Sequence, residues 1–288
     1  MPAQKHIRNP FEIAMAQLGS AFADAEHAVM AKPRRREQAA APTIRHITTH
    51  DLWDALKAGF GDFAATREDV VFIALVYPVA GLLLAALFLN QDLLPLVFPL
   101  ASGFAIIGPV AALGLYEISR RREAGQTVGW ADAFGVFRSP ALGSMFGLGL
   151  ILVALMLLWL AAAYGVYALT LGPTPPASAG AFVRETFETG AGWLMIVVGV
   201  GVGFLFAVLA LAISVVSFPL LLDRHIGVGQ AIETSVRVVA ANPWTMALWG
   251  LIVAGALAIG SLPALFGLIL VAPLLGHATW NLYRKLIA

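Results

Sequence analysis

Residues 192–222 read GWLMIVVGVGVGFLFAVLALAISVVSFPLLL, an unbroken apolar run without a charged or histidine side chain. The hydrocarbon core of a bilayer is about 30 Å thick and is crossed by roughly 20 helical residues. Backbone groups inside it must be hydrogen-bonded within the segment, so such a run is a helix. Five similar runs are Val70–Leu89, Leu93–Tyr116, Ala141–Leu169, Trp244–Ile259 and Leu262–Leu282. The sequence therefore predicts an all-α, polytopic membrane bundle of six transmembrane helices, the last two forming a tight hairpin.

The composition supports a chain that mostly faces lipid. Hydrophobic residues make up 59% and charged residues 12%, whereas a soluble domain carries about 25% charged residues. The net charge of +1 gives no reason to expect a nucleic-acid partner. The chain has no cysteine, which excludes disulfides, thiolate metal sites and thiol catalysis.

Positive charge is distributed unevenly between the two sides of the predicted spans. Seventeen of the 18 Lys and Arg residues fall in the N-terminal region, the loops after the second and fourth spans, and the C-terminus, whereas the other side holds only Arg184. Positive loops stay in the cytoplasm, so we expect both termini to be cytoplasmic. The candidates for topology signals and lipid-headgroup contacts are Arg120, Arg121, Arg122, Arg284 and Lys285.

Residues 1–43 are expected to form a cytoplasmic region that precedes a membrane domain at 44–288. An apolar stripe between Phe11 and Val29 has alternating spacings of four and three, which is typical of a docking helix. A linker with the basic run Arg34–Arg36 follows it. This run either attracts anionic lipid or serves only as a topology signal. No segment resembles the apolar core of a signal peptide, so no cleaved signal is expected.

A shorter pattern recurs three times, each time as an amphipathic segment followed by two spans. The segments begin near Asp54, Asp132 and Gln230. Such helices lie in the membrane interface with aromatic residues at headgroup depth. Copies in the same orientation favour a parallel repeat. The alternative is that any bundle of helical hairpins needs short amphipathic entry helices.

Ionisable groups are scarce within the predicted spans, where each would be a functional candidate. Glu117 ends the second span and is expected to pair with the arginines that follow it. His277 lies inside the last span, where it is either a haem, metal or proton-relay residue or a neutral histidine bonded to a neighbouring helix. The remaining histidines lie outside the spans, so no cofactor or metal is expected. The same scarcity argues against proton- or sodium-coupled transport.

Glycine pairs at helical spacing are the other candidates. Gly143 with Gly147 and Gly199 with Gly203 are each spaced i, i+4, which lets helices approach closely. We interpret both pairs as packing surfaces, either within the bundle or toward a partner subunit.

Several blocks resemble one bacterial integral-membrane family, known as domain of unknown function 2189. They include residues 94–104 (LPLVFPLASGF), 119–123 (SRRRE), 130–134 (WADAF), 217–224 (SFPLLLDR) and 276–280 (GHATW). The resemblance extends from about Ile44 to the C-terminus and implies a multi-span inner-membrane protein. Some members are labelled cytochrome c oxidase subunits, which implies a respiratory association. The family pattern supplies no catalytic residue, and the chain lacks the histidine cluster of a haem-copper subunit.

Three functional hypotheses follow. The first is a non-enzymatic accessory or scaffold subunit of a membrane complex, in contact with lipids and other integral membrane subunits. The second is a facilitator for an uncharged or lipidic solute, which requires a cavity between the spans. The third is a membrane enzyme that uses His277 with Glu117 or a nearby serine.

Overall fold

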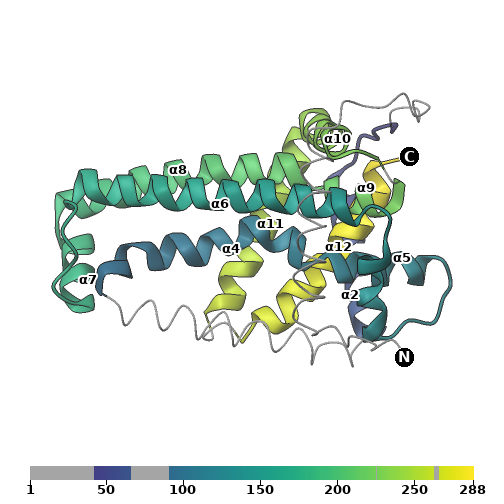
Figure 1. The fold of residues 1–288 in the computed structure, drawn as a ribbon, viewed down its shortest axis with the longest axis horizontal. Helices are drawn as coiled ribbons and strands as arrows, with labels where there is room; N and C mark the ends of the chain where they lie inside the picture. The colour runs from purple at the N-terminus through teal and green to yellow at the C-terminus, as the bar shows by residue number, and fades with distance from the viewer. Residues whose placement is uncertain (1–41, 66–90, 225, 263–265) are drawn as a thin grey trace, which may run out of the picture.

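The computed structural model describes residues 42–65, 91–224, 226–262 and 266–288, and this part of the chain is built from helices without a strand (Figure 1). The elements are α2 (Thr49–Ala65), η2 (Gln91–Leu96), α4 (Val97–Ala111), α5 (Leu113–Glu123), η3 (Trp130–Arg138), α6 (Leu142–Thr170), α7 (Ala179–Glu188), α8 (Gly190–Ser214), α9 (Ser217–Arg224), α10 (Val228–Ala241), α11 (Pro243–Ser261) and α12 (Leu268–Leu286). The prediction of an all-helical membrane fold is confirmed.

Four stretches are long and apolar enough to cross a membrane: Leu93–Glu123, Leu142–Thr170, Gly190–Arg224 and Pro243–Ser261. The predicted first span, Val70–Leu89, lies outside the described residues, as do the N-terminal docking helix and its basic linker. The predicted sixth span corresponds to α12, which is not among the four. The count of six spans is therefore not confirmed and stays a prediction.

Two of the four stretches are interrupted close to a proline. α4 ends at Ala111 and α5 begins at Leu113, just after Pro109. α8 ends at Ser214 and α9 continues the same path with Pro219 in its first turn. Proline lacks the amide hydrogen of the i to i−4 bond and its ring crowds the preceding turn. This explains the break before Pro219, whereas the break at Ala112 follows its proline and has another origin.

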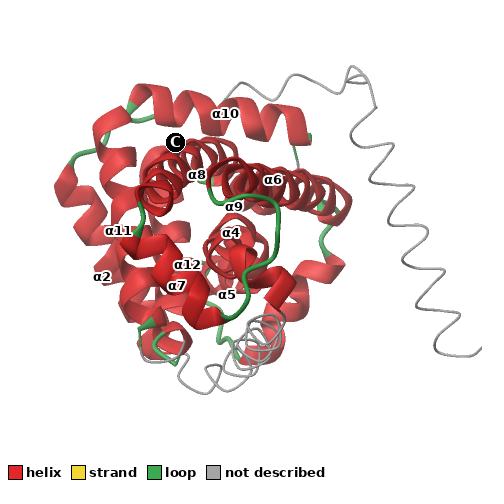
Figure 2. Ribbon diagram, turned by 90° about the vertical axis from the view of Figure 1, so that its left-hand side faces the viewer, coloured by secondary structure: helices red, strands yellow, loops and turns green. Residues whose placement is uncertain are grey.

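α6 and α8 run side by side over most of their length, and α4 lies beneath them (Figure 1). Trp159 of α6 lies at the centre of this contact. Its ring is 5.7 Å from that of Phe206 on α8, and its indole nitrogen donates to the carbonyl of Pro99 on α4 at 2.8 Å. A buried tryptophan needs a partner for its N–H, and the buried carbonyl of Pro99 in the first turn of α4 supplies one. Figure 2 shows the three helices almost end-on, with α10 crossing over them.

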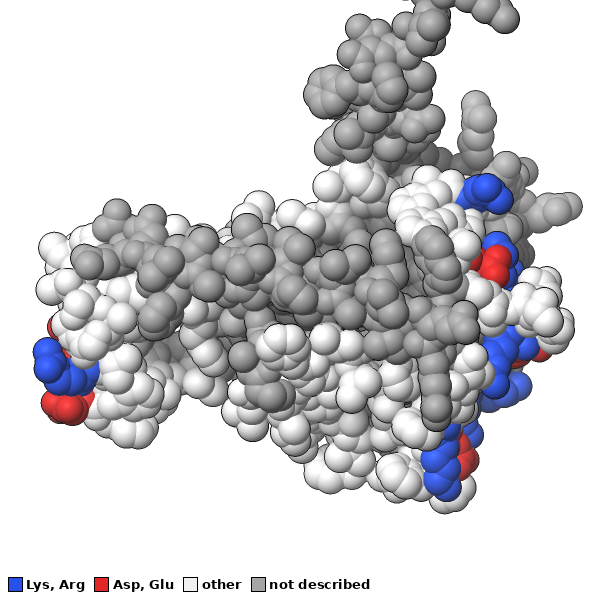
Figure 3. Space-filling view, turned by 90° about the horizontal axis from the view of Figure 1, so that it is seen from below, with Lys and Arg blue, Asp and Glu red and all other residues white. Residues whose placement is uncertain are grey.

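Charged side chains gather at the two ends of the long helices, and the described surface between them is uncharged in this view (Figure 3). Arg184, Glu185 and Glu188 belong to α7 at one end. The opposite end, called the basic end below, carries α2, α5, η3, α9, α10 and the C-terminal part of α12 (Figure 1). Residue 43 also lies there, since the amide of Ala288 donates to the carbonyl of Thr43 at 3.0 Å.

The three predicted amphipathic segments correspond to α2, η3 and α10, all at the basic end. The second is a 3-10 helix rather than an α-helix. In α2 the buried residues are Leu52, Ala55 and Gly59, whereas the aromatic residues Trp53 and Phe60 are exposed. The small residues face α12 because they allow a close approach, which leaves the aromatic residues outward. The threefold repeat itself stays a prediction.

α11 and α12 pack against each other at the predicted hairpin. Gly260 at the end of α11 meets Gly267 at the start of α12, and a Cβ atom on Gly267 would lie 2.6 Å from the carbonyl oxygen of Gly260. Glycine is therefore required at position 267, whereas a Cβ atom on Gly260 would lie 3.0 Å from the side chain of Leu268.

Candidate functional site at the basic end

Glu117 is the most deeply buried carboxylate of the basic end, with 2% of its surface exposed. Arg120 donates to it through Nε and Nη2 at 2.8 and 2.9 Å, and Arg121 donates through Nε at 2.6 Å. Arg121 also reaches Asp132 of η3 through Nη1 at 2.5 Å. A buried carboxylate is tolerated only when it is paired. Glu117 therefore has the two arginine partners expected from their spacing on the helix, and the cluster fastens η3 to α5.

The other three candidate basic residues bind to neighbouring helices. Arg122 donates to the carbonyl of Gly61 on α2 at 2.8 Å. Arg284 pairs with Glu123 at 2.9 Å. Lys285 pairs with two aspartates at the start of α2. These cations, like Arg121, join neighbouring helices, and their role as lipid contacts stays a prediction.

Asp51 is one of the two aspartates paired with Lys285, at 3.1 Å. Hydrogen bonds from the backbone amide and the hydroxyl of Thr48, followed by the hydrogen bond from Lys285, lower the pKa of Asp51 to about 2. These donors favour the charged carboxylate. The start of α2 and the end of α12 are thus joined by a charged contact.

His277 is buried and lies beside a serine of another helix. Its Nδ1 is 2.8 Å from Oγ of Ser119 on α5, and the same hydroxyl donates to Oδ2 of Asp62 on α2 at 2.8 Å. Asp62 also accepts from the amide of Asn281 at 2.9 Å and pairs with Arg122 at 3.2 Å. Three helices that are distant in sequence therefore meet in one buried polar cluster.

The hydrogen-bond pattern fixes the direction of the protons. Arg122 and the amide nitrogen of Asn281 can only donate to Asp62, and Ser119 donates to it as well. Ser119 has one proton and gives it to Asp62, so the bond between Ser119 and His277 uses the proton on Nδ1 of the ring. In a hydrolytic triad the histidine instead accepts the serine proton. The cluster of Asp62, Ser119 and His277 joins α2, α5 and α12 through hydrogen bonds.

No group of three or more histidine, aspartate or glutamate side chains with the arrangement of a metal site occurs in the described ranges. His277 has a serine and an aspartate near it, and Glu117 is surrounded by arginines.

The predicted glycine pairs lie on α6 and α8. Gly203 faces α6, where an added Cβ would be 3.0 Å from the ring of Trp159, whereas Gly199 has a neighbour only at 4.0 Å. Gly147 is buried within α6 and Gly143 is half-buried near its start. Much closer approaches occur at glycines outside these pairs. An added Cβ would lie 2.5 Å from the Ala278 backbone at Gly59, and 2.5 Å from Leu115 at Gly276.

Sequence reasoning missed Asp62, Ser119 and Asn242. Asn242 lies between α10 and α11, where its Oδ1 accepts from the amide of Ile47 at 2.9 Å and its Nδ2 donates to the carbonyl of Arg45 at 3.2 Å. Asn-Pro at a helix junction is a readable signal for a turn, but the partner of the side chain is 195 residues away.

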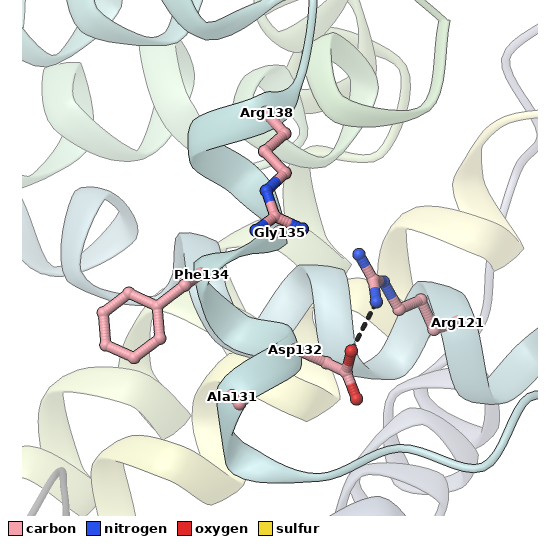
Figure 4. A pocket seen from close by; sticks show the side chains of 6 residues that line it. All are labelled: Arg121, Ala131, Asp132, Phe134, Gly135 and Arg138. Carbon is pink, nitrogen blue, oxygen red and sulfur yellow. Dashed lines mark hydrogen bonds and ion pairs between the residues drawn. The ribbon is translucent and has the colours of Figure 1, made fainter.

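Two adjoining hollows open beside the Glu117 cluster. The larger has a volume of about 270 Å³ and the smaller about 80 Å³. Their lining residues are Glu117, Arg120, Arg121, Ala131, Asp132, Phe134, Gly135, Arg138, Ser139, Pro140 and Leu222. Figure 4 shows Arg138 extending from the end of η3 over Gly135, with Arg121 opposite it and bonded to Asp132.

The residues that build this end fall partly within a known family. Residues 97–223 match the model of a family described as predicted integral membrane protein (DUF2189). This confirms the family resemblance for that range and supports an integral membrane protein; the matched range includes Glu117, Ser119 and the basic hollow, but not His277. No curated protein and no solved structure matches the chain.

Proposed function

We propose that this protein is a non-enzymatic accessory or scaffold subunit of an inner-membrane complex, with its basic end in the cytoplasm. The observation that carries the proposal is the outer face of α8. Val197, Val200, Phe204 and Val208 follow one another at helical spacing, and each has 44% to 66% of its surface exposed. α8 is therefore bare over most of its length among the described residues, and a second membrane protein can pack there.

The polar groups of the basic end support the same proposal. Glu117 is paired with Arg120 and Arg121 of its own helix, and Arg121 continues to Asp132 of η3, while His277 of α12 bonds to Ser119 of α5. A scaffold needs this arrangement because it keeps the cytoplasmic ends of the helices in fixed positions. A respiratory partner, implied by the label of some family members, stays a prediction.

The facilitator hypothesis is less favoured. It needs a passage between spans, but the inward face of α6 is filled by Met145, Leu148, Leu152 and Trp159, all of which are buried. The two hollows described above lie at the basic end and are lined largely by charged residues.

Site-specific photocrosslinking in native membranes tests the scaffold proposal. Benzoylphenylalanine replaces Val200 or Phe204 on α8, and Leu158 serves as a matched control because it is an equally exposed apolar residue on α6. We expect one integral membrane protein to be captured in high yield from both α8 positions and not from the control. Lipid adducts alone at all three positions would contradict the proposal.

A further inference from the structure

The basic hollow has an unbalanced charge. The guanidinium groups of Arg120, Arg121 and Arg138 line it together with a single carboxylate, that of Glu117. Asp132 at its edge reduces the excess but leaves one positive charge. An electropositive recess of this kind favours an anion.

Arg138 supplies the free donors. It is exposed, and it has no ion pair or hydrogen bond with any residue in the part of the chain that the structure describes. Its guanidinium group nevertheless extends over the hollow toward Arg121 (Figure 4). A planar guanidinium group matches two oxygens of a phosphate, so Arg138 can bind a phosphate without breaking an existing contact.

The other two arginines are held in place around the hollow. Glu117 binds Nε of both Arg120 and Arg121 and leaves part of each guanidinium group available. Gly135 lets Arg121 lie flat against the backbone of η3, because a Cβ atom there would be 2.3 Å from Nη2 of Arg121. Binding to groups that are already ordered costs less entropy than binding to mobile side chains.

The hollow lies at the depth of lipid headgroups. Ser139 and Pro140 in its wall directly precede α6, and the apolar run of that helix begins at Leu142. Phe134 and Phe137 on η3 are exposed, with their rings stacked 6.1 Å apart. Figure 4 shows Phe134 pointing away from the arginines. Aromatic residues beside basic ones are typical of the membrane interface.

We propose that this hollow binds the phosphate group of an anionic phospholipid, with the acyl chains passing beside Phe134 and Phe137. Its volume of about 270 Å³ is several times the roughly 30 Å³ of one water in the liquid, so a phosphate fits with its remaining waters. The position at the start of the apolar run favours a lipid phosphate over a free one, because a lipid brings its chains to the adjacent apolar surface.

Native mass spectrometry of the full-length protein in a neutral maltoside detergent tests the site. The probes are dioctanoyl phosphatidylglycerol, dioctanoyl phosphatidylcholine and inorganic phosphate. We expect phosphatidylglycerol to bind saturably and more tightly than the other two. Arg138→Gln should weaken its binding about tenfold or more, since hydrogen bonds between charged groups are the strong ones.

Two matched controls accompany this variant. Arg237→Gln removes an exposed arginine of α10 that lies outside the hollow, and it should change the affinity less than about twofold. Gly135→Ala should displace Arg121 and weaken binding, whereas Gly129→Ala, with open space around it, should not. If Arg138→Gln and Arg237→Gln lowered the affinity for phosphatidylglycerol equally, the lipid would be held by diffuse surface attraction, and the proposal would be overturned. Equal binding of inorganic phosphate and phosphatidylglycerol would overturn the lipid assignment.

Discussion

Replacing Gly59 by alanine tests how tightly α2 is packed on α12. A Cβ atom at position 59 would lie 2.5 Å from the backbone nitrogen of Ala278, 2.6 Å from its Cα and 2.7 Å from its Cβ. Ordinary contact begins at 3.4 Å, so the two helices must separate by almost 1 Å. Because the contact is with backbone atoms, no side-chain rotation relieves it.

The expected change in the free energy of unfolding of Gly59→Ala is the difference between destabilising and stabilising effects. Overpacking of this kind costs about 1–3 kcal/mol, and the separation also stretches the 2.9 Å bond between Asp62 and Asn281, whose weakening costs about 1 kcal/mol more. Alanine gains about 1 kcal/mol over glycine in a helix. We therefore expect Gly59→Ala to lower the free energy of unfolding by about 2 kcal/mol.

Gly61→Ala is the matched control, two residues along the same helix. It has no atom within 4 Å of an added Cβ, so only the helix preference remains and the variant should be about 0.5–1 kcal/mol more stable. Thermal unfolding of the full-length protein in detergent, followed by tryptophan fluorescence, measures both. A change of 1 kcal/mol in the free energy of unfolding moves the midpoint by about 2–4 °C. The midpoint of Gly59→Ala should therefore fall and that of Gly61→Ala should rise. Equal midpoints for Gly59→Ala and Gly61→Ala would refute the close α2–α12 contact.

Three further changes test the ties at the basic end. Ser119→Ala removes the hydroxyl between Asp62 and the histidine ring, so it should cost about 1–3 kcal/mol, and a double-mutant cycle with Asp62→Asn should show coupling between the two sites. Asn242→Ala leaves two backbone groups of the segment before α2 without their partner, so hydrogen exchange should accelerate in that segment and not in α6. The pKa of Asp51 is lowered to about 2, so its contribution to stability is present above about pH 4 and is lost as the pH falls through 2; in Asp51→Asn this part of the acid sensitivity should vanish.

Local features of the sequence predicted the parts of the fold that depend on neighbouring residues. Apolar runs identified four stretches that qualify as spans, because the thickness of a bilayer sets their length. The spacing of Glu117 before Arg120 and Arg121 predicted their ion pairs, because residues three and four apart share a helix face. The uneven distribution of Lys and Arg agrees with one end of the bundle being rich in charged helices (Figure 3).

Contacts between distant segments could not be predicted in the same way. Ser119 and His277 are 158 residues apart, and the sequence around either residue does not predict that they are in contact. Glycine spacing has the same limitation. The i, i+4 spacing selected Gly199, where an added Cβ atom would have a neighbour only at 4.0 Å. It did not select Gly59, which lies directly against α12. Spacing identifies a helix face, but the residue opposite that face depends on the tertiary arrangement.

Contacts with distant segments also decide whether the end of α12 faces protein or lipid. Its last turns carry Trp280, Tyr283 and Arg284, which bond to Glu123 and Asp223 at the ends of α5 and α9. In hydrocarbon such groups would be costly without partners, so this part of α12 belongs against protein rather than lipid. The blocks that carry the family resemblance thus meet at one place: the SRRRE block supplies Glu123, SFPLLLDR supplies Asp223 and GHATW supplies Trp280. Since the family match ends at residue 223, a fragment limited to residues 97–223 would lack α12 and leave the carboxylates of Glu123 and Asp223 without these partners.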